Sequence, residues 1–251
     1  MAFEREIDTL KRWIEESGNI VFFGGAGVST ESDIPDFRSQ DGLYSQSYRY
    51  PPERIISHSF FLSNTEEFYR FYRDRMIYPD ARPNRAHLAL AELERSGKLR
   101  AVITQNIDGL HQAAGSREVL ELHGSVQRNH CQRCGKFYPL SAVVSSESTV
   151  PRCTCGGIIK PDVVLYEESL DDAVMRRALE YISRADMLII GGTSLVVYPA
   201  AGLVRYYQGK RLVLINRSAT SMDDEADLVI GGRIGDVLGR AVFREESIKR
   251  R

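Results

Sequence analysis

The feature that most constrains the fold is a short apolar run that ends in glycine or polar residues and recurs along the chain. Residues 19–29 give the first example, in which NIVFF is followed at once by GGAGVS. Four further runs share this layout: 99–108, 186–195, 211–217 and 226–232. Segments with apolar residues at helical spacing lie between or after them: 83–96, 170–183, 200–209 and 234–243. Strands that alternate with helices predict an α/β fold with a parallel sheet covered on both faces.

Two stretches interrupt this alternation. Residues 39–80 contain many aromatic side chains and no strand signal, so we expect a helical insertion there. Residues 125–165 hold all four cysteines together with turn-forming residues, which predicts a small second module. The main domain is then assembled from residues 1–38, 81–124 and 166–251.

Composition limits the classes of function. The 251 residues include 33 basic and 34 acidic side chains, which gives a net charge of −1. A non-specific nucleic-acid binder would usually show a clear basic excess, so we expect no direct nucleic-acid binding. No stretch approaches the ~20 apolar residues of a membrane span, and the charged N-terminal segment is unlike a secretory signal. We therefore expect a cytoplasmic protein with no membrane partner, and disulfides are uncommon in the cytoplasm.

The cysteines have a spacing typical of a metal site. Cys131 and Cys134 are separated by two residues, and Cys153 and Cys155 follow as a second close pair. Four thiolates suit tetrahedral zinc, and a closed set of four leaves no position for water or substrate, so the expected site is structural. Three alternatives stay open: a redox C-x-x-C pair, His130 in place of one thiolate, and four unrelated buried cysteines.

The turn after the first predicted strand has the composition of a phosphate-binding loop. Gly25 and Gly27 match the start of the dinucleotide fingerprint G-x-G-x-x-G, although Thr30 stands where the third glycine belongs. Such a turn can bring backbone N–H groups onto a pyrophosphate. In the IPDFR stretch that follows, Arg38 is able to hold a phosphate and Phe37 to cover a planar ring. An ordinary strand–helix turn and a loop pinned by an Asp–Arg pair are the competing explanations.

Polar residues follow the later strands, at the edge of the sheet where α/β proteins bind ligands. Gln105, Asn106 and Asp108 end the second predicted strand, and their alternative role is to cap the next helix. His123 stands directly before Gly124, just ahead of the cysteine-rich module. A neutral imidazole at that place is a candidate general base near pH 7.

Eight motifs taken together resemble the sirtuin family of NAD-dependent protein deacylases. They follow the family's order from about residue 24 to about residue 235, which is nearly the whole chain. They are GAGVS at 25–29, IPDFR at 34–38, TQNID at 104–108, LHG at 122–124, the paired cysteines, KPDVVLYEE at 160–168, GGTSLVVYPAA at 191–201 and INR at 215–217. Each motif is weak alone, but eight in order leave little room for chance. One departure is Gly24, where the family often has threonine.

The resemblance implies a Rossmann-type NAD-binding domain and a small zinc-ribbon domain, with NAD and acyl-lysine meeting between them. It implies that His123 and Asn106 are catalytic and that the four cysteines hold structural zinc. The residues implied to contact NAD are Ala26, Thr30, Phe37, Arg38, Gln105, Ile107, Asp108, His123, Thr193, Ser194, Asn216 and Ile234. Val163 and Val164 would pair with the substrate peptide as an added strand.

The chemistry that the resemblance implies consumes NAD and moves no hydride. The bond between nicotinamide and ribose breaks, and the amide oxygen of acyl-lysine attacks the sugar in a pocket that restrains water. His123 then removes a proton from a ribose hydroxyl. The expected products are free lysine, nicotinamide and O-acetyl-ADP-ribose. The expected enzyme is therefore a protein deacetylase, a transferase that acts on acetylated protein or peptide substrates.

Acetyl-lysine is the default substrate, and succinyl- or malonyl-lysine is the alternative. Sirtuins that prefer those acidic groups share a Tyr-x-x-Arg in the helical insertion, and Tyr72 and Arg75 have this spacing. Side chains three residues apart on a helix lie on one face, so both could reach one acyl group. The competing explanation is that Arg75 pairs with an acid such as Asp74 or faces water.

Three other functions stay open on the sequence. An NAD-dependent dehydrogenase would explain the sheet and the glycine loop, but it would leave the cysteine module and His123 unexplained. A zinc ribbon on an inactive Rossmann domain could bind acetylated peptide without consuming NAD. ADP-ribosyl transfer to protein is a further outcome within the family.

Overall fold

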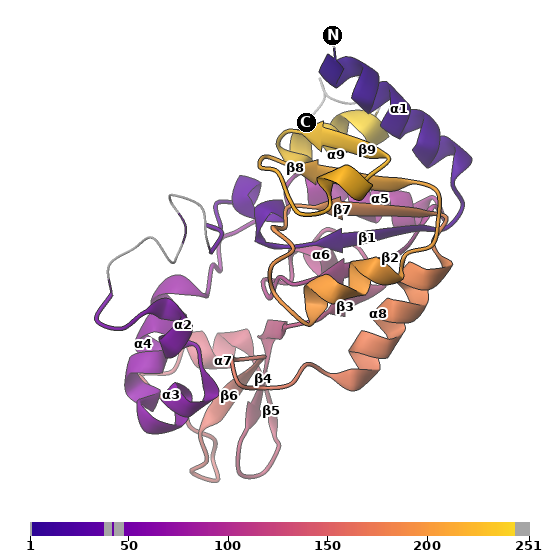
Figure 1. The fold of residues 1–251 in the computed structure, drawn as a ribbon. Helices are drawn as coiled ribbons and strands as arrows, with labels where there is room; N and C mark the ends of the chain where they lie inside the picture. The colour runs from indigo at the N-terminus through magenta and orange to yellow at the C-terminus, as the bar shows by residue number, and fades with distance from the viewer. Residues whose placement is uncertain (1, 38–41, 43–47, 244–251) are drawn as a thin grey trace.

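The computed structural model describes residues 2–37, 42 and 48–243. The chain forms a large α/β lobe around a six-stranded sheet and a small lobe built from the insertion and the cysteine-rich segment (Figure 1). The predicted NAD contact Arg38 lies outside the described residues. Within these ranges, no helix has the length and apolar composition that a bilayer crossing needs.

The six strands of the large sheet are all parallel and stand in the order β3-β2-β1-β7-β8-β9. Their bounds are Ile20–Gly24 (β1), Leu99–Thr104 (β2), Val119–Glu121 (β3), Met187–Gly191 (β7), Leu212–Asn216 (β8) and Leu228–Gly231 (β9). The chain builds from the centre out to β3 and then returns to the other side of β1. At such a switch point, the loops at the carboxyl ends of the strands diverge and leave a crevice for a ligand.

Apolar residues on both faces of the strands bury the sheet. Phe22 belongs to one hydrophobic cluster, whereas its neighbours Val21 and Phe23 belong to the other, as the two-residue repeat of a strand requires. The covering helices are α1 (Ala2–Glu16), α5 (Arg85–Arg95) and α9 (Ile234–Val242) on the first cluster, and α8 (Asp172–Arg184) and the 3₁₀ helix η4 (Ala200–Tyr206) on the second. The predicted Rossmann-type α/β architecture is confirmed.

The small lobe has one hydrophobic core, which the insertion and the cysteine-rich segment share. Its elements are the helices α2 (Pro52–Ile55), α3 (His58–Ser63), α4 (Thr65–Arg75) and α7 (Leu140–Val144), and the antiparallel strands β4 (Gly124–Cys131), β5 (Phe137–Pro139) and β6 (Ile159–Val163). Phe68 and Tyr69 of α4 are fully buried in the cluster that also contains Val126 and Ile159. The predicted helical insertion is therefore present, and its aromatic side chains pack on the cysteine-rich module.

The connection between the lobes runs through Gly124, where the backbone adopts the left-handed conformation that favours glycine. Its φ is +72°, and a Cβ atom there would lie 1.7 Å from the carbonyl oxygen of Asp162. This close approach lets two segments cross, and the amide of Val164 donates to the carbonyl of His123 (3.0 Å). The backbone of His123 is thereby fixed where the two lobes meet.

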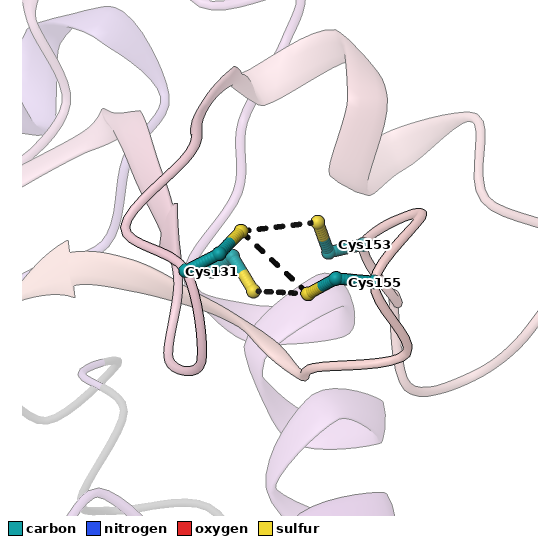
Figure 2. A group of neighbouring side chains, drawn as sticks. Cys131, Cys153 and Cys155 are labelled. Carbon is teal, nitrogen blue, oxygen red and sulfur yellow. Dashed lines mark hydrogen bonds between the residues drawn. The ribbon is translucent and has the colours of Figure 1, made fainter.

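The four cysteine sulfurs converge in the small lobe (Figure 2). They all lie within 4.8 Å of one another, and the Sγ atoms of Cys131 and Cys155 are 3.4 Å apart. The Sγ atom of Cys134 lies 3.6 Å from those of Cys153 and Cys155. Four sulfurs bound to zinc at about 2.3 Å would lie about 3.8 Å apart in a tetrahedron, so the residues fit a structural zinc ion. A redox pair would need only the first two cysteines, whereas all four sulfurs converge here. The set of four sulfurs is complete without His130, whose ring packs on a phenylalanine of β5.

Replacing Cys131 by serine should remove the zinc, because a hydroxyl does not replace a thiolate in a closed four-sulfur shell. We expect about one equivalent of zinc in the unaltered protein and almost none in Cys131→Ser, with a melting temperature lower by about 10 °C. Elemental analysis and calorimetry measure the two effects. Thr154→Ser changes an exposed side chain between Cys153 and Cys155, in the second cysteine turn, and should alter neither. A chelated, zinc-free protein with an unchanged melting temperature would contradict the prediction.

Candidate active site

A large cleft lies between the lobes, over the carboxyl ends of the central strands. Its volume is about 1340 Å³, and segments of both lobes line it. Every described residue that the sequence predicts to contact NAD or peptide lines this cleft: Ala26, Thr30, Phe37, Gln105, Asn106, Ile107, Asp108, His123, Val163, Val164, Thr193, Ser194, Asn216 and Ile234. The fold therefore brings together side chains that lie far apart in the sequence.

Glycines after β1 and β7 allow two loops at the cleft to come into backbone contact. The amide of Gly27 donates to the carbonyl of Gly192 (2.8 Å). A Cβ atom on Gly27 would lie 2.8 Å from the Cα of Gly192, and one on Gly192 would lie 2.4 Å from the nitrogen of Val28. The loop then makes two short 3₁₀ turns, η1 (Ala26–Val28) and η2 (Thr30–Ser32). Thr30 begins the second turn without a positive φ, and its hydroxyl donates to the carbonyl of Gly27 (3.0 Å), so the backbone does not require a glycine at this position.

Ser29, Asn106 and Asp108 form a hydrogen-bonded group inside the cleft. The Ser29 hydroxyl donates to Asp108 (2.7 Å) and accepts from the side-chain amide of Asn106 (3.0 Å). The other carboxylate oxygen of Asp108 accepts the amide of Leu110 (2.8 Å), the first residue of α6 (Leu110–Ala113). Burial raises the pKa of the Asp108 carboxyl above its ordinary value, although these hydrogen bonds act in the opposite direction. Asp108 thus accepts the first amide of the next helix and also holds Ser29.

Sequence reasoning does not identify Ser29 as a residue of the site. Its side chain is polar yet only 1% exposed, and it links the loop after β1 to the end of β2. The available signal is a hydroxyl residue immediately after a glycine turn. That signal is too common to single out one serine.

Gln105, Thr193 and Asn216 join the ends of β2, β7 and β8. The Gln105 side chain donates to the Thr193 hydroxyl (3.4 Å). Thr193 and Asn216 pair more closely, because each donates to the other: the Thr193 amide to Asn216 Oδ1 (3.1 Å) and Asn216 Nδ2 to the Thr193 carbonyl (3.1 Å). Ile234 packs beside them at the start of α9 and is 3% exposed. Together these residues form one wall of the cleft.

His123 is held in one orientation with a neutral ring. Its Nδ1 lies 3.0 Å from the carbonyl oxygen of Gln105. Because a carbonyl can only accept, Nδ1 carries the hydrogen, and the neutral ring keeps its lone pair on Nε2. Burial lowers the pKa of His123 below its ordinary value of 6.5, and the bond to Gln105 offsets part of that shift. A neutral imidazole with an available lone pair is a competent general base.

Strand β6 presents an edge to the cleft. It is an outer strand of the β5-β4-β6 sheet, and it ends at Val163, which lines the cleft together with Val164. Among the residues that the structure describes, no other strand pairs with its outer side. Main-chain groups along such an edge can bind an extended peptide as an added strand.

Tyr72 and Arg75 are not brought together in the cleft. Tyr72 is fully buried and stacks on Phe68 at a ring-centroid distance of 5.8 Å, and it is absent from the described lining of the cleft. Arg75 does line the cleft, but its guanidinium pairs with Asp74 (2.7 Å), as the competing explanation expects. An acidic acyl group would therefore meet no Tyr–Arg pair, which argues against the succinyl- and malonyl-lysine alternative.

Comparisons with known proteins agree with this geometry. The model of the Sir2 family matches residues 25–199. An NAD-dependent protein deacetylase of Clostridium acetobutylicum is 61% identical over 236 residues, which cover 93% of this chain and 96% of that protein. A solved structure of Sir2 with a p53 peptide and NAD⁺ matches with a TM-score of 0.85 and 41% identity, covering 96% of this chain and 99% of the other. A Sir2 variant with a deacetylated p53 peptide and 3′-O-acetyl ADP-ribose gives the same TM-score and identity, covering 93% and 96%. The resemblance to sirtuins is thus confirmed, and the chain belongs to the Sir2 family.

Proposed function

We propose that this protein is an NAD-dependent protein deacetylase. It transfers the acetyl group of acetyl-lysine to ADP-ribose and releases nicotinamide and O-acetyl-ADP-ribose. The observation that carries the proposal is the neutral, oriented ring of His123 inside the cleft where the predicted NAD and peptide contacts converge. The deacetylase relative at 61% identity and the Sir2 structure with peptide and NAD⁺ support it.

The residues of the cleft fit NAD along its whole length. The loop with Ala26 and Thr30 would hold the pyrophosphate, with Phe37 covering a planar ring. Asn216 and its paired threonine would hold the adenosine end. Asp108, held by Ser29, which in turn accepts from Asn106, would orient the nicotinamide and its ribose. When bound, NAD supplies the sugar that accepts the acetyl group.

The residues of this chain contribute binding, orientation and one proton transfer. The buried polar group around Asp108 has partners of its own, so it does not need water, and a closed pocket restrains the competing attack by water. Nε2 of His123 would accept a proton from a ribose hydroxyl. The ring then becomes cationic, and the carbonyl of Gln105, 3.0 Å from Nδ1, stabilises that charge.

The substrate class is acetylated protein or peptide. The open edge of β6 at Val163 would bind the main chain of the substrate peptide. Such binding gives affinity with little selectivity for the side chains of the peptide. We favour acetyl over acidic acyl groups because Tyr72 is buried outside the described lining of the cleft, so no Tyr–Arg pair meets the acyl group. The net charge of −1 gives no reason to invoke nucleic acid. A cytoplasmic location fits the four cysteines of the zinc site, which form no disulfide in the described structure, because disulfides are uncommon there.

A panel of acetyl-, succinyl- and myristoyl-lysine peptides incubated with NAD tests the reaction. Mass spectrometry should detect nicotinamide and O-acetyl-ADP-ribose, with the acetyl peptide turned over at least about tenfold faster than the succinyl peptide. A rise in NADH absorbance would instead identify a dehydrogenase. Binding of the acetyl peptide without loss of NAD would identify a non-enzymatic reader, and ADP-ribose attached to protein would identify a different transferase.

Removing the imidazole in His123→Ala should lower kcat/KM by about a hundredfold or more, because a positioned general base contributes on that scale. Circular dichroism and the melting temperature should stay close to those of the unaltered protein. His130→Ala is the matched control, since this histidine packs on a phenylalanine of β5 outside the described lining of the cleft. Full activity in His123→Ala would remove the proposed base.

The dependence of kcat/KM on pH should follow the protonation of His123. Because the neutral form of His123 is the base and burial lowers its pKa below 6.5, protonation at low pH should switch the activity off. We expect kcat/KM to rise with pH along a limb whose apparent pKa lies below 6.5 and to level off by about pH 7. Steady-state rates between about pH 5 and pH 9 measure this limb. An apparent pKa well above 7 would be inconsistent with a buried neutral imidazole.

A further inference from the structure

Asn84 lies at the amino end of α5, outside the described lining of the cleft, and its side chain makes two kinds of contact. Its Oδ1 accepts the amide of Ala86 (2.9 Å), which caps the helix. Its Nδ2 donates to the carbonyl of Val28 (2.7 Å) and to the hydroxyl of Ser32 (3.0 Å), both in the loop after β1. One side-chain amide thus ties the start of a helix to the loop that lines the cleft.

The bond to Val28 acts on the peptide unit that carries Ser29. The carbonyl of this unit accepts from Asn84, and its amide donates to the carbonyl of Ala26 (3.0 Å), so the peptide plane is held from both sides. The side chain of Ser29 leaves from this plane and reaches Asp108 (2.7 Å). The orientation that Asn84 imposes therefore passes directly to a polar group of the cleft.

The acceptors of Asn84 are poorly placed to find water. Val28 is fully buried, and Ser32 is only 6% exposed. A buried carbonyl that loses its donor carries an uncompensated desolvation cost, which the loop can avoid only by moving. The second half of the loop has a separate anchor, because the carboxylate of Glu31 accepts the amide of Gly235 (2.6 Å) at the start of α9. Loss of the Asn84 bonds should therefore disturb the first half of the loop most.

We propose that Asn84 is a positioning residue for NAD. Asn84 holds the loop after β1 in its binding shape without touching the ligand. The inference rests on the proposed function, since it takes NAD as the ligand of this loop. A loop that must first be ordered binds its ligand more weakly than one that is already ordered. The peptide edge is on β6 in the other lobe, so the effect should fall on NAD and spare the peptide.

Asn84→Asp separates the two contacts of this side chain. A carboxylate oxygen still accepts the amide of Ala86, and aspartate caps a helix about as well as asparagine. The hydroxyl of Ser32 can reverse its bond and donate to the new carboxylate. The carbonyl of Val28 cannot reverse, so it loses its donor and faces a negative charge.

Asn19→Asp is the matched control. Asn19 also donates its Nδ2 to a backbone carbonyl, that of Arg184 (2.6 Å), but it immediately precedes β1 at the amino end of the strand. The same substitution there breaks the same kind of bond at the edge of the sheet opposite the cleft. Comparison of the two variants separates loop positioning from a general loss of stability.

Titration calorimetry with NAD alone, without peptide, is the deciding measurement. We expect the dissociation constant for NAD to rise about tenfold in Asn84→Asp and to change less than about twofold in Asn19→Asp. Hydrogen exchange of the free protein should be faster at residues 26–32 in the first variant, and KM for the acetyl peptide should stay within about twofold. If Asn84→Asp melts at a much lower temperature, Asn84→Ser, which keeps a capping hydroxyl, replaces it in every comparison.

An NAD affinity within about twofold of the unaltered value would overturn the positioning role, as would an equal loss in Asn19→Asp. The proposed function fails separately: an unaltered protein that binds NAD but deacetylates no peptide would refute it and leave the calorimetric comparison decisive. If the unaltered protein bound no NAD at all, both conclusions would be wrong.

Discussion

The structure depends most on the crossing of two chain segments where the lobes meet. The first segment leaves β3 through His123 and Gly124, and the second leaves β6 through Val164. The missing Cβ of Gly124 brings the two backbones close enough for the amide of Val164 to bond the carbonyl of His123. Arg128 braces the same crossing with a carboxylate from each segment, Glu121 (2.6 Å) and an aspartate of β6 (2.8 Å). His123, the proposed base, is thus placed by the contact that also sets the two lobes around the cleft.

Within the cleft, polar side chains are held by one another. A hydrogen-bonded group buried in this way is costly if one member loses its partner, so each member fixes the orientation of the next. One series of hydrogen bonds runs from Asn84 through the Val28 peptide unit to Ser29 and Asp108. Its first link lies outside the cleft and its last link lies inside. The rigidity of the site therefore comes from hydrogen bonds as well as from the packed sheet beneath it.

The sequence predicts the parts of this architecture that depend on local pattern. Apolar runs that end in glycine mark the parallel strands, and cysteines in two close pairs mark the metal set. Contacts between distant segments carry no such pattern, which is why Ser29 and Asn84 become visible only in the structure. Tyr72 shows the opposite error, in which spacing alone is over-interpreted. Its place three residues before Arg75 gives both a common helix face, but the aromatic core of the small lobe takes the tyrosine ring.

Burial alone does not identify the proposed base. His87 and His111 are also buried, with ring centroids 4.7 Å apart, and burial lowers the pKa of each, that of His87 to about 4. His123 is less buried than these two, but its pKa is also lowered, so all three histidines are neutral near pH 7. His87 uses its Nδ1 to accept the amide of Asn84, so its ring belongs to the cap of α5. His123 differs because its ring lines the cleft and its Nδ1 is engaged by a carbonyl, which leaves the lone pair on Nε2. Position in the cleft and the identity of the hydrogen-bond partner, rather than a shifted pKa, distinguish a base from a structural histidine.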